Sequence, residues 1–178
     1  MSDVVVKLKP KAAGPDPLTS EDFRHAMSRL ASAVGVVACW DRGSPVGLLV
    51  SSVTSLSIDP PRLLFCLQKA NRSHDAFFRA DACSVSILSD EDQAEAERFS
   101  SAERYWERFD PAAWALDPRS PPRYRPALLC LSGTISHRMD AGTHSLFIVN
   151  VAEASVGNAS PLVYFDRRFA TLQPVAGR

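Results

Sequence analysis

Residues 36–54 read VVACWDRGSPVGLLVSSVT, in which two apolar, β-branched runs flank the polar turn DRGSP at positions 41–45. This arrangement is typical of a β-hairpin with a longer turn, because residues that favour strands lie on both sides of glycine and proline. It predicts one strand over Val36–Trp40 and a second over Val46–Thr54. The chain is therefore expected to build at least part of its core from antiparallel strands.

The segment before this hairpin predicts a helix. Thr19 and Asp22 form a capping-box pattern, and we expect the helix that follows them to end near Gly35. Residues 1–18 are polar and rich in proline, without the apolar stretch of a secretory signal, and are expected to be a poorly ordered arm before a single domain over residues 19–174. Four apolar residues fall on one face of the expected helix: Phe23, Met27, Leu30 and Val34.

Downstream of the hairpin, short apolar runs again predict strands. A short helix is expected over residues 73–80, and residues 90–108, rich in Glu, Ala and Arg, predict one or two surface helices. Five prolines between residues 110 and 126 predict an irregular segment, because proline interrupts both helices and ladders. Strands are expected over residues 63–68, 83–88, 128–137 and 144–154, with a turn over 138–143, and on both sides of Arg167 and Arg168.

The fold class expected from this order is mainly β. Short strands outnumber helices, and they do not alternate with helices as in a doubly wound parallel sheet. A small antiparallel barrel with peripheral helices fits this pattern better. Closure of the barrel also removes sheet edges that such apolar strands would expose.

Composition excludes several classes of protein. The 178 residues contain 20 Lys and Arg against 20 Asp and Glu, so the chain lacks the basic excess of a sequence-independent nucleic-acid binder. The longest apolar runs, such as residues 145–154, fall short of the roughly twenty residues that span a membrane. No nucleic-acid partner and no membrane partner are expected.

The four cysteines show no metal-binding pattern. Cys39, Cys66, Cys83 and Cys130 are far apart, each lies in an apolar run, and no CxxC motif or Cys/His pair has ligand spacing. We expect buried free thiols and a cytoplasmic location. No metal is expected.

Arg72, Ser73 and His74 precede the short helix predicted over residues 73–80. A guanidinium, a hydroxyl and free backbone N–H groups at a helix N-terminus form an anion site suited to phosphate. The alternative is a plain serine N-cap with solvated neighbours. Both interpretations stay open on these residues alone.

Two other places are candidates for ligand contact. His137, Asp140 and His144 surround a predicted turn, but their spacing is not that of a metal site, and His144 is instead placed to orient a substrate by hydrogen bonding. Gly47 interrupts the second strand of the hairpin, which ends in two serines. Such a glycine marks either a simple bulge or the close approach of a backbone or ligand.

Several segments resemble the short-chain flavin reductase family, whose members are reductase components of two-component flavin-dependent monooxygenases. The resemblance spans about residues 23–172. It implies an FMN-binding split β-barrel, antiparallel and Greek-key-like, with peripheral helices. The segments are FRHAM at 23–27, GLLVSSVTSLSIDPPRLL at 47–64, NRSH at 71–74, RF at 98–99, DAGTH at 140–144 and PLVYF at 161–165.

The resemblance also implies a reaction and its partners. The reaction is hydride transfer from NADH or NADPH to FMN or FAD, after which the reduced flavin passes to a partner monooxygenase. Such chemistry requires only that two rings be stacked and aligned, so no nucleophile is needed from the protein. A homodimer is implied as well, with the flavin site at or near the subunit interface.

The resemblance assigns residues to the cofactors. The flavin lies along residues 47–52, and its phosphate is held by the loop at residues 72–74. Arg98 and Phe99 lie near the phosphate or adenine end, and His144, the catalytic candidate, lies near the nicotinamide. The full set assigned to cofactor binding is Pro45, Gly47, Leu48, Leu49, Val50, Ser51, Ser52, Gln68, Asn71, Arg72, Ser73, His74, Arg98, Phe99, Tyr164 and Arg168.

Three departures from the family pattern leave alternatives open. Leu49 stands where a threonine or small residue is common, Thr143 replaces an aspartate, and Val149-Asn150 replaces a Gly-Glu pair. The first removes a flavin hydrogen bond, and the other two alter charge on the nicotinamide side. These departures favour the alternative of a flavin-binding protein without reductase activity. A separate alternative, which keeps the fold, is a reductase that passes electrons to another acceptor such as a corrin or ferric chelate.

Overall fold

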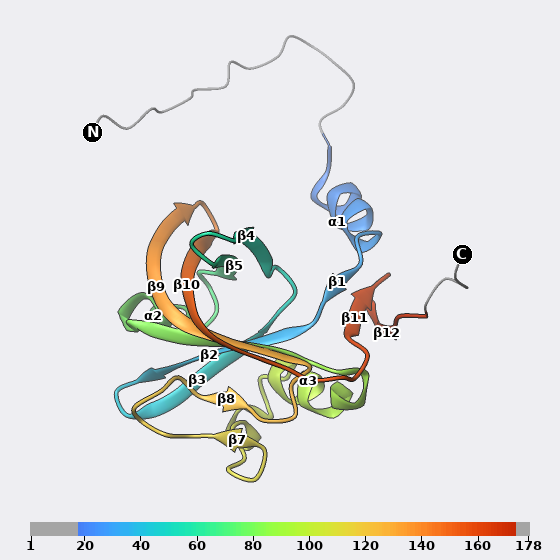
Figure 1. Ribbon diagram of the computed structural model, residues 1–178. Coiled ribbons are helices and arrows are strands. Elements are labelled where there is room, and N and C mark those ends of the chain that lie inside the picture. Colours follow the sequence, from blue (N-terminus) through green and yellow to red (C-terminus); the bar gives the residue numbers. More distant parts are fainter. Residues whose placement is uncertain (1–17, 174–178) are drawn as a thin grey trace, which may run out of the picture.

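The computed structural model describes residues 18–173, so residues 1–17 of the predicted arm lie outside the described residues. Within this range the largest sheet has seven strands in the order β3-β2-β6-β9-β10-β5-β4, and all neighbouring pairs are antiparallel. The mainly β prediction is confirmed (Figure 1). The strands are β2 Gly35–Asp41, β3 Ser44–Val50, β4 Thr54–Ser57, β5 Arg62–Gln68, β6 Ala82–Ile87, β9 Leu129–Ala141 and β10 His144–Val156.

Smaller elements surround this sheet. A second sheet has the order β1-β11-β12, and a short ladder joins β7 to β8. Figure 1 shows α1 on the same side of the molecule as β1 and β11. The bounds are α1 Ser20–Ser28, β1 Ser32–Ala33, α2 His74–Arg79, η1 Asp90–Asp92, α3 Gln93–Ser100, η2 Tyr105–Glu107, β7 Trp114–Ala115, β8 Arg123–Tyr124, β11 Leu162–Phe165 and β12 Arg168–Thr171.

The N-terminal helix begins as predicted but ends earlier. Thr19 caps it, because its Oγ1 accepts from Asp22 N at 3.1 Å and its own N–H donates to the Asp22 carboxylate. The helix ends at Ser28, not near Gly35. Ser28 O accepts from Asp166 N at 2.8 Å, and β1 then pairs with β11, so tertiary pairing replaces the last predicted turns.

Four other boundaries differ from the prediction. The turn between β2 and β3 is only Arg42-Gly43, not the longer turn expected over residues 41–45, because both residues adopt a positive φ and reverse the chain at once. The strand expected over Val46–Thr54 ends at Val50, and Thr54 starts β4, which pairs with β5. The turn between β9 and β10 is only Gly142-Thr143, because Gly142 adopts φ 70° and reverses the chain at once. The irregular segment over residues 110–126 nevertheless contains the ladder between β7 and β8. The helices predicted over residues 90–108 are confirmed.

Two clusters of buried apolar side chains pack against the two faces of the sheet. The first lies inside its curl and includes Phe65 and Phe147, whose rings stack at 5.3 Å between centroids. The second packs α3 and the segment after it against β2 and β3, with Phe99 and Trp114 at its centre. Both faces of β3 are therefore packed up to Val50, where the strand ends.

The predicted free thiols are confirmed, with one difference in burial. Cys39, Cys83 and Cys130 are buried, and burial raises the pKa of the Cys39 thiol to about 12. Cys66 is only half-buried. None of the helices described within residues 18–173 is long and apolar enough to cross a membrane.

Candidate functional site

A groove of about 370 Å³ lies where the end of β3 approaches β5 and the start of β10. One wall is Leu48–Ser52, and the other combines the end of β5 with Asn71 and His144. Register explains the second wall, because His144 pairs directly with Gln68. The lining residues are Leu48, Leu49, Val50, Ser51, Ser52, Cys66, Leu67, Gln68, Asn71 and His144, and all except Cys66 and Leu67 were predicted as site residues.

The outer edge of β3 offers backbone hydrogen bonds to a ligand. Successive residues of an antiparallel strand point their N–H and C=O groups alternately toward the partner strand and away from it. Gly47 O accepts from the Arg108 guanidinium at 3.1 Å, so Gly47 points away from β2. Leu49, two residues later, points the same way, and its N–H and C=O face the groove edge. A flat ligand with donors and acceptors on its rim is suited to this edge.

The Ser52 side chain connects the two walls of the groove by hydrogen bonds. Its hydroxyl accepts from Cys66 N and donates to Cys66 O, both at 3.1 Å. These bonds join the segment after β3 to the middle of β5, 14 residues further along the chain. The structure therefore gives Ser52 a role in closing the barrel that sequence reasoning missed; both Ser52 and Ser51 are exposed.

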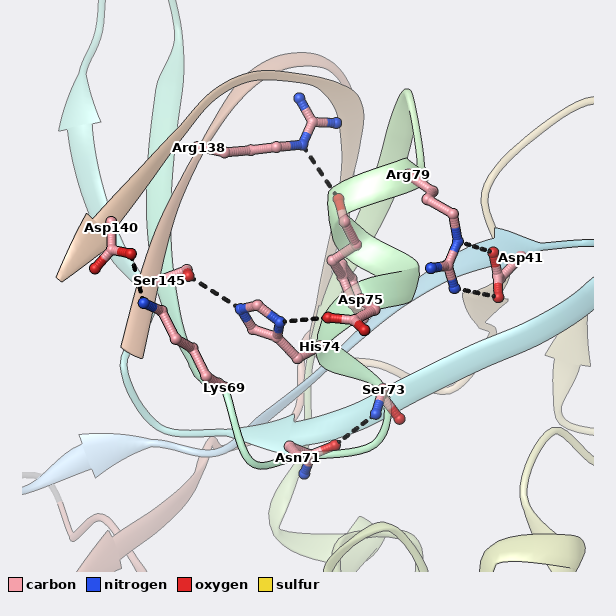
Figure 2. Close-up of polar contacts among 11 residues, drawn as sticks. Asp41, Lys69, Asn71, Ser73, His74, Asp75, Arg79, Arg138, Asp140 and Ser145 are labelled. Carbon is pink, nitrogen blue, oxygen red and sulfur yellow. Dashed lines mark hydrogen bonds and ion pairs between the residues drawn. The ribbon is translucent and has the colours of Figure 1, made fainter. Parts of the chain in front are cut away.

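The backbone N–H groups at the start of α2 were predicted to be free, but two of them are hydrogen-bonded within the protein. Ser73 N donates to Asn71 Oδ1 at 2.9 Å (Figure 2). His74 N donates to Asn71 O, also at 2.9 Å. The expectation of free N–H groups is wrong for these two, because Asn71 folds back over the helix start. Ser73 makes no side-chain cap bond, and its Oγ is buried without a hydrogen-bond partner among the described residues.

Positive charge gathers beside this loop. The Arg72 guanidinium lies 3.7 Å from the centre of the Tyr105 ring, and that of Arg108 lies 5.0 Å from it. Burial and the nearby Arg72 charge lower the pKa of Arg108, whose guanidinium also donates to Phe99 O at 2.8 Å and Ser101 O at 3.0 Å. The exposed guanidinium of Arg72 and the unpartnered hydroxyl of Ser73 fit a phosphate group beside this end of the groove, and Arg108, whose own donors bond backbone carbonyls, adds positive charge there.

The remaining predicted residues lie at different distances from the groove. Pro45 is upstream on β3, and Gly47 is buried, where a Cβ would meet Phe109 at 2.9 Å and Phe99 at 3.2 Å. Phe99 is 2% exposed, so its ring serves the core and not the groove surface. Arg98 pairs with the buried Glu95.

Two predicted residues come from the second sheet. Tyr164 is 40% exposed and lines two further hollows, which meet the groove at Ser51. Arg168 is exposed on β12, with its guanidinium 3.9 Å from Asp166. The structure therefore brings Tyr164 close to the groove and leaves Arg168 at the surface.

His144 is exposed at the first position of β10, with Nδ1 2.9 Å from the Thr143 hydroxyl. Thr143, which replaces the family's aspartate, therefore still bonds this imidazole. Val149 is buried in the core, and Asn150 pairs with Arg62, both at the far end of the β5–β10 pairing from His144. The predicted effect of these two on charge near His144 is wrong, because the strand carries them away from it.

Arg108 and Tyr105 were missed by sequence reasoning. Arg108 reaches the carbonyls of Gly47, Arg98, Phe99 and Ser101, and a set of acceptors from separate segments leaves no local pattern. Among residues 18–173, no group of three or more His, Cys, Asp or Glu side chains is arranged to hold a metal ion.

Fold and site together define a small antiparallel barrel protein with a groove beside the end of its sheet and basic groups next to that groove. The chain belongs to the flavin reductase family: the family model described as "Flavin reductase like domain" matches residues 27–173.

Individual relatives agree with this assignment. The chain is 32% identical over 161 residues to the reductase component of 4-nitrophenol 4-monooxygenase/4-nitrocatechol 2-monooxygenase of Rhodococcus opacus, covering 89% of this chain and 84% of that one. It is 32% identical over 157 residues to an FMN reductase (NADH) RutF of Methylorubrum extorquens, covering 88% and 77%. It matches a structure of the Streptomyces globisporus NADH:FAD oxidoreductase SgcE6 in complex with NAD and FAD fragments, with a TM-score of 0.80, 25% identity and coverage of 93% and 100%.

Proposed function

We propose that this protein is an NAD(P)H:flavin oxidoreductase that reduces FMN or FAD by hydride transfer and supplies reduced flavin to a partner monooxygenase. The observation that carries the proposal is the groove itself. It unites the end of β3, the 68–71 segment and His144, which are far apart in the sequence. Family membership and relatives whose names state flavin reduction support the same conclusion.

Each part of the groove has a separate task in this proposal. The outward N–H and C=O of Leu49 bind the polar rim of the flavin, and a leucine side chain does not prevent this because the backbone makes the bonds. Arg72 and Ser73 bind the phosphate. His144 contacts the nicotinamide ring from the opposite wall. When bound, the flavin supplies the hydride acceptor, so the task of the chain is to hold two rings in contact and exclude water.

The test is oxidation of NADH and of NADPH by the purified protein, with FMN and FAD in turn. We expect turnover that depends on added flavin, and anaerobic bleaching of the flavin by the nicotinamide. Flavin that binds stoichiometrically but is not bleached would show a binding protein without reductase activity. Electron transfer only to a corrin or ferric chelate would show another acceptor.

Cys66 provides a direct test of where the flavin binds. It is the half-buried thiol in the groove, whereas the other three cysteines are buried. Iodoacetamide is therefore expected to label Cys66 first, as followed by peptide mass spectrometry. FMN at ten times its dissociation constant is expected to slow this labelling about tenfold, because only the free protein reacts. A labelling rate that FMN leaves unchanged, with glutathione as the reference thiol, would place the flavin elsewhere.

We also propose a homodimer in which a second copy covers α1. Phe23, Met27 and Leu30 are 54%, 45% and 58% exposed, and they line an apolar hollow of about 640 Å³ that reaches Ser51 and Ser52 of the groove wall. Burial of such an apolar face stabilises association. The second copy would therefore enclose one side of the flavin site.

A double variant tests this arrangement. Phe23→Glu combined with Met27→Glu is expected to convert the dimer to a monomer in light scattering, because it places two charges in the apolar contact. Ile58→Glu is the matched control, since Ile58 is 90% exposed on the turn between β4 and β5. A monomeric wild-type protein, or a double variant that remains dimeric, would contradict the proposed interface.

A further inference from the structure

The imidazole of His74 forms a buried polar link that the proposed reaction does not use. Its Nε2 lies 3.0 Å from Ser145 Oγ and its Nδ1 lies 3.1 Å from Asp75 Oδ1 (Figure 2). This order of serine, histidine and aspartate is that of a hydrolytic triad. Ser145 is 0% exposed, however, so its hydroxyl reaches no substrate and is not a nucleophile. The link needs another explanation.

The hydrogen-bond roles within the link follow from the partners. The Asp75 carboxylate accepts, so Nδ1–H donates to it, and Nε2 is left to accept from the Ser145 hydroxyl. The rings of Phe78 and Phe147 lie 5.0 Å and 6.1 Å from the imidazole, centre to centre. The imidazole is thus fixed by two directional bonds and two aromatic contacts.

This link joins two segments of the same wall of the groove, the loop that begins at Asn71 and the start of β10. His74 directly follows Arg72 and Ser73, and Ser145 directly follows His144. The other ties between the same segments are a backbone bond from Lys69 N to Thr143 O and an exposed ion pair from Lys69 to Asp140. Of the two side-chain ties, only that between His74 and Ser145 is removed from water, where a hydrogen bond is stronger.

We propose that His74 and Ser145 are positioning residues, which set the place of His144 relative to the loop that binds the flavin phosphate. This inference rests on the proposed function. His144 is exposed, and among the described residues its side-chain hydrogen bond is to the neighbouring Thr143, so its position depends on the backbone at Ser145. Misplacement of a reacting ring by about 1 Å costs up to about a hundredfold in rate.

Kinetics of Ser145→Ala provide the first test. The variant is expected to raise the KM for NADH and to slow flavin reduction about tenfold, while the dissociation constant of FMN stays within about twofold, because misalignment affects the hydride transfer step and not flavin binding. Ser86→Ala is the matched control, since Ser86 is also 0% exposed but bonds Cys130 and Tyr124. An equal effect of both variants would mean that only stability changed, and would overturn the proposal.

A double-mutant cycle shows whether the link acts through His144. In a His144→Ala background, Ser145→Ala is expected to cause no further loss of rate. Losses that multiply independently would overturn the positioning role. Failure of the proposed function itself would look different, because the wild-type protein would then not reduce flavin at all.

Hydrogen exchange of the flavin-free protein gives a readout independent of activity. Ser145→Ala and His74→Phe are each expected to speed amide exchange over residues 140–146 about fivefold, which corresponds to the loss of one hydrogen bond of about 1 kcal/mol. Ser86→Ala is expected to leave this segment unchanged. Unchanged exchange in both link variants would overturn the proposal whatever the kinetics show.

Discussion

Arg72→Ala is expected to raise the dissociation constant of FMN about tenfold or more and to leave that of riboflavin unchanged. Arg72 is exposed beside the groove, and no carboxylate within residues 18–173 forms an ion pair with it, so its charge is available to a phosphate. A charge-assisted hydrogen bond contributes about 1.5–3 kcal/mol, which is about tenfold to a hundredfold in affinity. Titration followed by flavin fluorescence measures both constants.

The comparison of the two flavins isolates the phosphate contact. Riboflavin has the same ring and lacks the phosphate, so a loss confined to FMN identifies the group that Arg72 binds. Arg79→Ala is the control variant, because Arg79 lies at the other end of α2 and pairs with Asp41 at 2.9 Å. Equal weakening of both flavins would mean that Arg72 acts by packing on Tyr105. Added salt is expected to reduce the difference, because it screens exposed charges.

Gly133→Ala is expected to destabilise the fold by about 3 kcal/mol or more, the upper end of the range for overpacked positions. A Cβ at this position would lie 2.0 Å from Asn150 O and 2.9 Å from Asn150 C. These are backbone atoms of β10, next to a register shift in its pairing with β9, and they move only if the ladder breaks. A fall in Tm of about 10 °C is expected for a chain of this size, measured by circular dichroism.

Gly157→Ala is the matched control for this prediction. A Cβ there would lie 3.4 Å from its nearest neighbours, which is ordinary contact. We expect its Tm to stay within a few degrees of the wild type, in line with substitutions away from strained positions. Equal melting temperatures for the two alanine variants would show that β10 relaxes around residue 133 without cost.

Local patterns predicted the elements whose causes are local. The hairpin, though with a shorter turn than expected, and the capping box at Thr19 are confirmed, because turn chemistry and caps depend on residues next to one another. The early end of α1 was not predictable in this way. It depends on Asp166 and β11, which lie more than 130 residues further along the chain.

The candidate site likewise has features that the sequence predicted and features that depend on tertiary packing. The segments at 47–52 and 71–74 were identified from the sequence. In the structure, residues 48–52, Asn71 and His144 line one groove, and residues 72–74 follow Asn71 beside it. The sequence did not reveal that Asn71 occupies two amides of the helix start, that Phe99 is buried in the core, or that His74 bonds Ser145. Each of these depends on the direction of a side chain after packing.

By itself the sequence determined the class of fold, the family and the set of residue types available for binding, because strand periodicity, turn residues and motif order are written along the chain. Tertiary structure alone decided which of those residues line the groove. Strand register places His144 against Gln68, and alternation along β3 turns the backbone of Leu49 outward. The first pairing joins segments that are far apart in the sequence, whereas the second belongs to the hairpin of β2 and β3; in both, a shift of one residue in register would turn these groups to the opposite side.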